Sequence, residues 1–314
     1  MTTTSAEERS RDVAAPGHRR RGQLFIVIAA TGWSTAGLLQ RELSVSTATQ
    51  VCGRSLAALI VLSAVLVAKE RGQVVSSMRS IGGSGVIFAV CMAGAMGMFI
   101  FALNHSSVAN VLFIQAMSPF VAVILAWFVM RERATRRTWM ATAVAVAGVG
   151  LMVGGPGRGS ASGLIASCVM TVLFSITIVL ARHRKDISML PALVLGQFFL
   201  FASTIAFAEF GGLHTRDFVV FGLMGSVQMG MSQVCFAAGA RLIPAAEVAL
   251  LTLLEVVLGP LWVWLVNGEV PGNLTLIGGG IVLIAVVYQT TESSPSGGTH
   301  LAETADVTIP ATTL

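Results

Sequence analysis

The fold of this chain is decided by a stretch that occurs twice, as PFVAVILAWFVMRERATRRTWMATAVAVAGVGLMV at residues 119–153 and as VVLGPLWVWLVNGEVPGNLTLIGGGIVLIAVVYQT at residues 256–290. In each copy an apolar run ends in a short loop with a glutamate, and a second apolar run follows. A constant offset of 137 superposes Glu132 on Glu269 and Asn110 on Glu247. An internal repeat in an apolar chain is typical of a membrane transporter, with the substrate site between the two halves.

The composition also indicates a membrane protein. Hydrophobic residues make up 54% of the chain and charged residues 11%, with a mean hydropathy of +0.80, whereas about a quarter of a soluble domain is charged. Apolar stretches of about 16–23 residues recur, which is enough to cross a hydrocarbon core of about 30 Å as helices. Because these stretches are continuous and do not alternate with polar residues, they predict helices and exclude a barrel of strands.

The predicted fold is an all-α polytopic membrane protein with ten transmembrane helices. The expected spans are 23–39, 48–68, 84–103, 107–129, 138–153, 162–181, 189–208, 217–238, 244–266 and 274–289. They form two five-helix repeats at 23–153 and 162–290, joined by a Gly-rich outer linker at 154–161. The polar segments 1–22 and 291–314 are interpreted as disordered tails.

Positive charge predicts the orientation. With both termini in the cytoplasm, sixteen of the twenty Lys and Arg residues fall in inner segments, and only Arg41, Arg158 and Arg216 fall in outer loops. Arg54 lies inside a span. This asymmetry follows the positive-inside rule and predicts a multi-pass protein of the cell inner membrane. Because five helices per half is an odd number, equivalent helices cross in opposite directions, which makes the repeats inverted. The net charge of +5 then reflects topology and predicts no nucleic-acid partner.

Weak motifs recur in the same order in both halves. They are Gly32-Trp33-Ser34, Arg54, Ser107 to Pro119, Glu132 and Gly148-Val149 in the first half, and Phe174-Ser175, Pro244-Ala245-Ala246, Leu254-Glu255, Gly268-Glu269 and Gly278 in the second. With them the chain resembles the drug/metabolite transporter superfamily, in its ten-helix form with two EamA-type domains. One departure is that the family's Leu-Glu-Pro reads Leu254-Glu255-Val256 here, with the proline at Pro260. The kink of that helix is therefore expected about one turn later.

Two ionisable residues are expected within the membrane. An ionisable side chain near the bilayer centre costs at least ~2.5 kcal/mol on insertion scales, so it should face a cavity or a partner. Glu255 lies near mid-membrane, and it is a candidate for the translocation path and for proton coupling, or else for a structural bond in a kinked helix. Arg54 is a candidate substrate contact, or else a partner for a carboxylate or a helix end. A pair between Arg54 and Glu255 stays open.

Further polar and aromatic residues are candidates for substrate binding. Glu247 is predicted either as a proton site bordering the same cavity as Glu255, or as an interfacial glutamate that reaches headgroup water. The other candidates are Asn110, Gln115, Gln228 and Gln233, whose alternative role is interhelical hydrogen bonding, and Trp33 and Trp262, which could stack on a planar substrate.

The predicted function is a secondary transporter of small metabolites, most simply an exporter of amino acids or related compounds. The sequence has no phosphate-binding loop and no metal-ligand spacing, so we expect no cofactor and no enzyme activity. Uptake of a vitamin or nucleobase-like nutrient stays open as an alternative. An intramembrane enzyme and a non-transporting scaffold are further alternatives. The expected partners are a small-molecule substrate, the lipid bilayer and protons as coupling ion. The sequence leaves a homodimer open.

Overall fold

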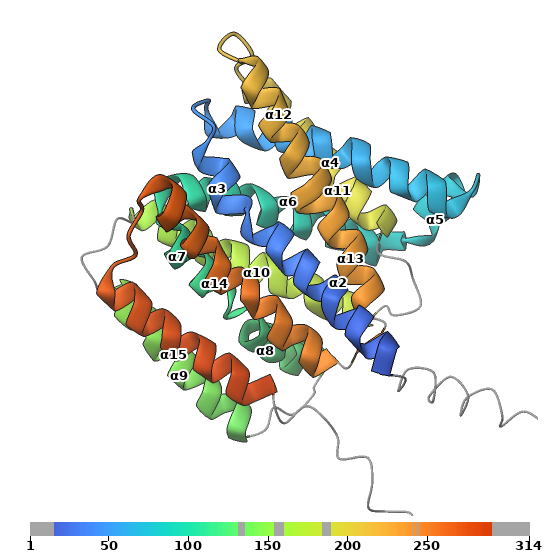
Figure 1. Ribbon diagram of the computed structural model, residues 1–314. Helices are drawn as coiled ribbons and strands as arrows, with labels where there is room; N and C mark the ends of the chain where they lie inside the picture. Colours follow the sequence, from blue (N-terminus) through green and yellow to red (C-terminus); the bar gives the residue numbers. More distant parts are fainter. Residues whose placement is uncertain are drawn as a thin grey trace, which may run out of the picture.

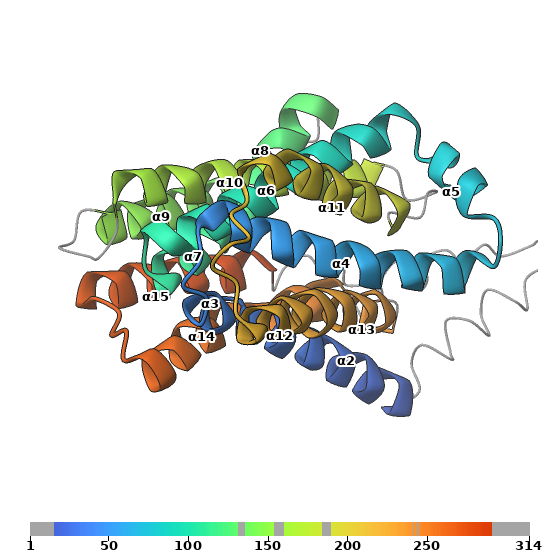
Figure 2. The same ribbon diagram turned by 90° about the horizontal axis from the view of Figure 1, so that it is seen from above.

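The computed structural model describes residues 16–130, 136–153, 160–183, 190–240, 242–243 and 245–290 of the chain. Residues 1–15 of the predicted tail at 1–22, the predicted tail at 291–314, most of the linker at 154–161 and the loop with Glu132 lie outside these residues. Every helix and turn described belongs to one bundle (Figures 1 and 2). Its α-helices are α2 (Pro16–Ser34), α3 (Ala36–Arg41), α4 (Thr47–Glu70), α5 (Val74–Ser80), α6 (Gly82–His105), α7 (Val108–Gln115), α8 (Ser118–Met130), α9 (Arg136–Val153), α10 (Ala161–His183), α11 (Leu190–Thr204), α12 (Thr215–Leu223), α13 (Ser232–Gly239), α14 (Ala245–Asn267) and α15 (Asn273–Thr290).

The helices match the predicted spans in number and place. Within the described residues, seven helices are long and apolar enough to cross a membrane, and three shorter apolar helices lie within α9, α14 and α15. The first helix differs from its prediction, because α2 begins at Pro16 and not at residue 23. Its extra turns are held by Arg19 and Gln23, which both bond Glu247 on α14. The short α5 was not predicted, since seven residues are too few to show a helical period.

The internal repeat is visible in the helix bounds. Helices α7 and α8 together span Val108–Met130, and α14 spans Ala245–Asn267, which is the same interval shifted by 137. The same shift relates α9 to α15 at both ends. The break between α7 and α8 precedes Pro119, whereas α14 runs unbroken through Pro260. The two copies therefore share their length and differ in continuity, and the kink expected near Pro260 stays a prediction.

The packing of the helices also repeats. Helix α9 packs on its equivalent α15, and α4 packs on its equivalent α11. Other large contacts come in matched pairs: α6 with α10 corresponds to α13 with α2, and α10 with α7 and α8 corresponds to α2 with α14. A twofold axis relating the two halves requires this pattern, because equivalent helices must meet across the axis. The fold is thus an all-α polytopic membrane protein built as two inverted five-helix repeats.

Two glycines named by the sequence lie where equivalent helices meet. A Cβ at Gly148 on α9 would come within 2.7 Å of the Gly278 carbonyl oxygen on α15. Helices without a strong hydrophobic drive in lipid associate through such close backbone approach. The α9–α15 contact therefore depends on the absence of a side chain at Gly148.

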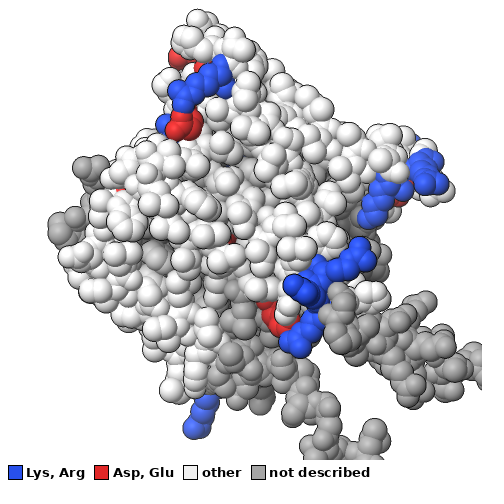
Figure 3. All heavy atoms as spheres, in the orientation of Figure 1, with Lys and Arg blue, Asp and Glu red and all other residues white. Residues whose placement is uncertain are grey.

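The flank of the bundle is apolar. Large side chains such as Ile60, Phe128, Met140 and Ile284 are more than half exposed there, although most would be buried in a soluble protein. The face of the molecule in Figure 3 is mostly uncharged at its centre, and charged side chains gather near the start of α12, beside α5 and at the start of α2. This distribution fits a surface that contacts lipid chains and meets water at its ends.

Candidate functional site

The pairing of α2 and α3 with α14 brings the two halves together along the length of the bundle. Three of the polar contacts along this pair share one sequence separation of 228: Arg19 with Glu247, Ser34 with Trp262, and Arg41 with Glu269, which directly follows α14. A constant separation means that the helices run parallel and in register, so the contacts lie at one end, in the middle and at the other end.

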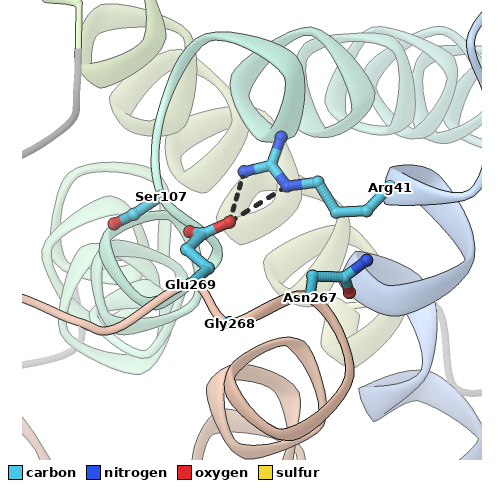
Figure 4. A pocket seen from close by; sticks show the side chains of 5 residues that line it. All are labelled: Arg41, Ser107, Asn267, Gly268 and Glu269. Carbon is cyan, nitrogen blue, oxygen red and sulfur yellow. Dashed lines mark hydrogen bonds and ion pairs between the residues drawn. The ribbon is translucent and has the colours of Figure 1, made fainter.

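The contact at the end of α3 is a charged network around a small cavity (Figure 4). Nε and Nη2 of Arg41 lie 3.0 and 2.9 Å from Glu269 Oε2, and the same guanidinium donates to the carbonyl oxygens of Leu103 and Ser106. Glu269 Oε1 accepts the Val108 N–H at 3.1 Å. Since Val108 opens α7, the carboxylate also caps that helix where its free N–H groups favour an anion. The cavity measures about 280 Å³.

Local sequence explains the position of Glu269. Gly268 adopts a φ of 68°, the left-handed conformation that ends helices and that glycine adopts without strain. Its N–H bonds the Trp264 carbonyl oxygen at 3.0 Å, which closes the last turn of α14. The chain then reverses, and Glu269 points back toward Arg41 and the start of α7 (Figure 4). Gly268 therefore ends α14 and turns the chain so that Glu269 reaches Arg41.

The opposite end of the same helix pair carries a second charged contact. Arg19 Nη2 lies 2.5 Å from Glu247 Oε1, and Gln23 Nε2 donates to Oε2 of the same carboxylate at 3.1 Å. Arg19 is largely exposed and Glu247 is partly exposed. The carboxylate of Glu247 is thus bonded to two residues of α2, and both of its predicted roles stay predictions.

Arg54 and Glu255 do not pair with each other. Arg54 Nε donates to Gln228 Oε1 at 3.2 Å, which joins α4 to the π-helical segment Met224–Met231 between α12 and α13. The Glu255 carboxylate is hydrogen-bonded by the Gln115 side chain at the end of α7. The pair that the sequence left open is therefore absent, and each ionisable group is bound instead by an amide from the other half of the chain.

The remaining candidates are placed mainly by helix packing. Asn110 Oδ1 accepts a hydrogen bond from the Thr275 hydroxyl at 3.0 Å, which links α7 to α15. Trp262 Nε1 donates to Ser34 Oγ at 3.0 Å, beside the interruption between α2 and α3. The Trp33 ring lies 5.2 Å from the Phe236 ring, so it packs α2 on α13. Gln233 lies half-buried on α13.

One polar cluster was not predicted. Gln40 and Asn104 both donate to the Gln50 side-chain oxygen, and Asn104 also donates to Thr47. Gln40 and Gln50 are almost fully buried. A signal existed, because amides next to apolar spans are costly unless they are bonded. The sequence does not say that three different helices bring them together.

The helices bring polar side chains from both halves together, and charged pairs hold the two ends of the α2/α3–α14 contact. Within the described ranges, no group of three or more His, Cys, Asp and Glu side chains could hold a metal ion.

Comparison with known proteins shows which proteins this chain is similar to. The model of the EamA-like transporter family matches twice, at residues 20–154 and 161–291. The "Uncharacterized transporter YwfM" of Bacillus subtilis (strain 168) is 30% identical over 130 residues, which cover 41% of this chain and 44% of that protein. A solved structure described as "Crystal structure of protein" superposes with a TM-score of 0.62 at 18% identity, covering 86% of this chain and 96% of the other. This last likeness concerns the fold alone.

Proposed function

Since the chain belongs to the EamA-like transporter family, a family of membrane transporters, we propose that it is a secondary exporter of small metabolites. Amino acids and related compounds are the proposed substrates. The protein works by alternating access, in which one half rocks against the other around a central site. It resides in the inner membrane with both termini in the cytoplasm, as the positive-inside rule requires.

One observation supports this mechanism above the others, namely that charged contacts close the α2/α3–α14 pair at both ends. The Arg19–Glu247 contact lies at the proposed cytoplasmic end, and the Arg41–Glu269 contact lies at the outer end. Between them lie the polar side chains that bridge the two halves. Opening either end requires breaking one charged contact and leaves the other intact. The two contacts are therefore proposed as the inner and outer gates of one pathway.

Glu255 is the proposed coupling residue. It lies on α14 between the two proposed gates, and the neutral side chain of Gln115 hydrogen-bonds to it. Without a cation beside it, the carboxylate can take up a proton when it faces one side and release it at the other. Proton entry would then drive export of the substrate. A homodimer remains compatible with this proposal, but the mechanism does not need one.

The test is a comparison of metabolites in medium and cytoplasm between cells that overexpress the protein and cells that lack it. An exporter lowers the cytoplasmic level of its substrate and raises the level in the medium. A Glu269→Gln variant, overexpressed to the same membrane abundance, is compared with the wild type. Because it loses the proposed outer gate, its rate of substrate release should differ from that of the wild type. Accumulation of a compound inside the overexpressing cells would indicate uptake instead. Identical metabolite levels in both strains would refute transport of these compounds.

A further inference from the structure

A cation lies buried among neutral groups in this bundle. Arg54 is 4% exposed on α4, two turns from the start of that helix. An arginine within the hydrocarbon region costs at least ~2.5 kcal/mol on insertion scales, and such residues normally pair with an anion. Within the described ranges, every carboxylate ion pair engages another cation: Arg19, Arg41, His214 or Arg216. Arg54 therefore has no acidic partner in this part of the chain.

The neighbours of the guanidinium are weak or neutral acceptors. Besides the Gln228 side-chain oxygen, Nη2 lies 3.8 Å from Met96 Sδ, and the Phe99 ring centroid lies 5.9 Å from the guanidinium carbon. A guanidinium has five N–H donors in a planar fork that matches a carboxylate with two parallel bonds. These neighbours engage Nε and Nη2, and they leave Nη1 without an oxygen acceptor among the described residues.

The backbone holds this arginine in a defined place. Gly225 and Gly230 lie in the π-helical segment, and a Cβ at either glycine would overlap Ala57 or Val61 on α4. The two helices thus approach closely on both sides of Gln228. Ser232 Oγ donates to the Val227 carbonyl oxygen at 3.1 Å, five residues earlier, which supports the wider turn. π-helical turns inside α-helices are frequent at functional sites, because they redirect a side chain.

We propose that Arg54, positioned by Gln228 and the π-helical segment, binds a carboxylate group of the transported substrate. The proposal rests on the proposed function, since the ligand is taken to be the transported molecule. It narrows the substrate class to small compounds that carry a carboxylate. Nη1 and the weakly bonded Nη2 supply two parallel donors, and the substrate supplies the negative charge that the described neighbours of Arg54 lack.

The first experiment measures binding without transport. The full chain is purified in lipid nanodiscs. Its melting temperature is measured as the concentration of sodium acetate is raised until the shift no longer increases. Acetamide with sodium chloride at equal ionic strength is the neutral probe of the same size. Acetate should raise the melting temperature by roughly 2–4 °C, and acetamide should not, because only the anion forms an ion pair with the Arg54 guanidinium.

Two variants and a control make the result specific. Arg54→Gln should lose the acetate shift while remaining folded, since it removes a buried charge and keeps a hydrogen-bonding side chain. Arg54→Lys should keep part of the shift, because it retains the charge without the fork. Arg79→Gln removes an exposed arginine on α5 and should respond as the wild type does. An equal acetate shift in Arg54→Gln, or no shift in the wild type, would overturn the proposal.

The second experiment follows substrate chemistry in cells. Compounds that the wild-type protein releases into the medium should carry a carboxylate, and Arg54→Gln should reduce their release at least tenfold at equal membrane abundance. Release of compounds without an anionic group, unchanged in Arg54→Gln, would contradict the carboxylate site. If the wild type releases nothing, the proposed export fails, whereas the acetate measurement still decides whether Arg54 binds an anion.

Discussion

Four of the polar contacts inside this protein cross between its halves. Arg54 bonds Gln228, Gln115 bonds Glu255, Asn110 accepts from Thr275, and Trp262 donates to Ser34. Each pair takes one residue from either side of the linker. Interhelical hydrogen bonds in lipid stabilise by roughly 0.6 kcal/mol on average, so such a pair is weak enough to break during a conformational change. The same contacts that hold the halves together can therefore exchange with a substrate.

Glu255 is the residue on which proton coupling is expected to depend. Glu255→Gln keeps the size and the hydrogen bonding of the side chain but removes the charge that a proton would neutralise. It should abolish release of substrate driven by a proton gradient in proteoliposomes, with normal protein abundance. Glu209→Gln, at an exposed carboxylate outside the bundle core, is the matched control. Normal gradient-driven transport by Glu255→Gln over a range of pH would assign the carboxylate a structural role.

The sequence predicts which single residues are polar and buried, but it does not predict their partners. Arg54 stands out as the lone charged residue of the span 48–68, and Glu255 as the charged residue nearest the middle of the span 244–266. Their partners Gln115 and Gln228 were candidates too, yet the pairing depends on which helices are neighbours. Whether Arg54 and Glu255 pair, which they do not, stayed open in the sequence for that reason. Arg41 was recognised only as a loop charge, because its contact with Glu269 requires the parallel register of α2 and α14.

At the scale of helices, the contact between α9 and α15 gives a prediction with an internal control. Gly148→Ala places a Cβ against the Gly278 carbonyl oxygen, so the two helices must separate. Such overpacking costs about 1–3 kcal/mol, which should lower the melting temperature of the protein in lipid. Gly150→Ala, two residues further along α9, meets open space and should leave stability unchanged or slightly higher, since alanine favours helix. Equal effects at both positions would mean that close packing here is unimportant.

The Arg41–Glu269 contact is expected to hold the start of α7 closed. Without either partner, Ala109 in the first turn of α7 should become more accessible; it is 2% exposed in the closed form. In a background without the four native cysteines, maleimide labelling of Ala109→Cys in nanodiscs should accelerate roughly tenfold in Arg41→Gln or Glu269→Gln, for a charged hydrogen bond of about 1.5 kcal/mol.

A charge swap separates the ion pair from the helix cap in the same assay. Arg41→Glu combined with Glu269→Arg restores opposite charges, but arginine cannot accept the Val108 N–H, so labelling should slow only in part. Arg216→Gln removes the neighbouring Arg216–Glu42 pair, which does not touch α7, and should label at the original rate. Equal labelling in all variants would show that the contact does not control access.

The lengths of the helices could be predicted more fully than their irregularities. Apolar run length determines the spans, and the 137-residue offset transfers them between halves, so α14 and α15 follow from α7 to α9. The π-helical segment has no comparable signal, because one extra residue in a turn does not change the apolar pattern of residues 217–238. It arises from tertiary packing of Gly225 and Gly230 on α4.

At the scale of the whole molecule, the matched helix pairs support an inverted arrangement in which charge alone selects the orientation. The two halves are related by repeat, yet basic residues do not follow the repeat. Arg136 and Arg137 follow Glu132 in the first half, whereas the equivalent Asn273 and Leu274 follow Glu269 in the second. If equivalent loops lie on opposite sides of the membrane, the positive-inside rule requires this difference. The charge asymmetry and the packing thus lead to one topology.

Reporter fusions test that topology directly. A reporter after Arg71, after Gly157 or at the C-terminus should read cytoplasmic, external and cytoplasmic, because the chain has crossed the membrane two, five and ten times. Replacing Arg136 and Arg137 by glutamine removes part of the inner charge without adding any outside, so these readings should persist with a weaker contrast. An external C-terminus would mean an odd number of crossings. The two halves could then not each contribute five helices, and the pairing of α9 with α15 would need another explanation than a twofold axis in the membrane plane.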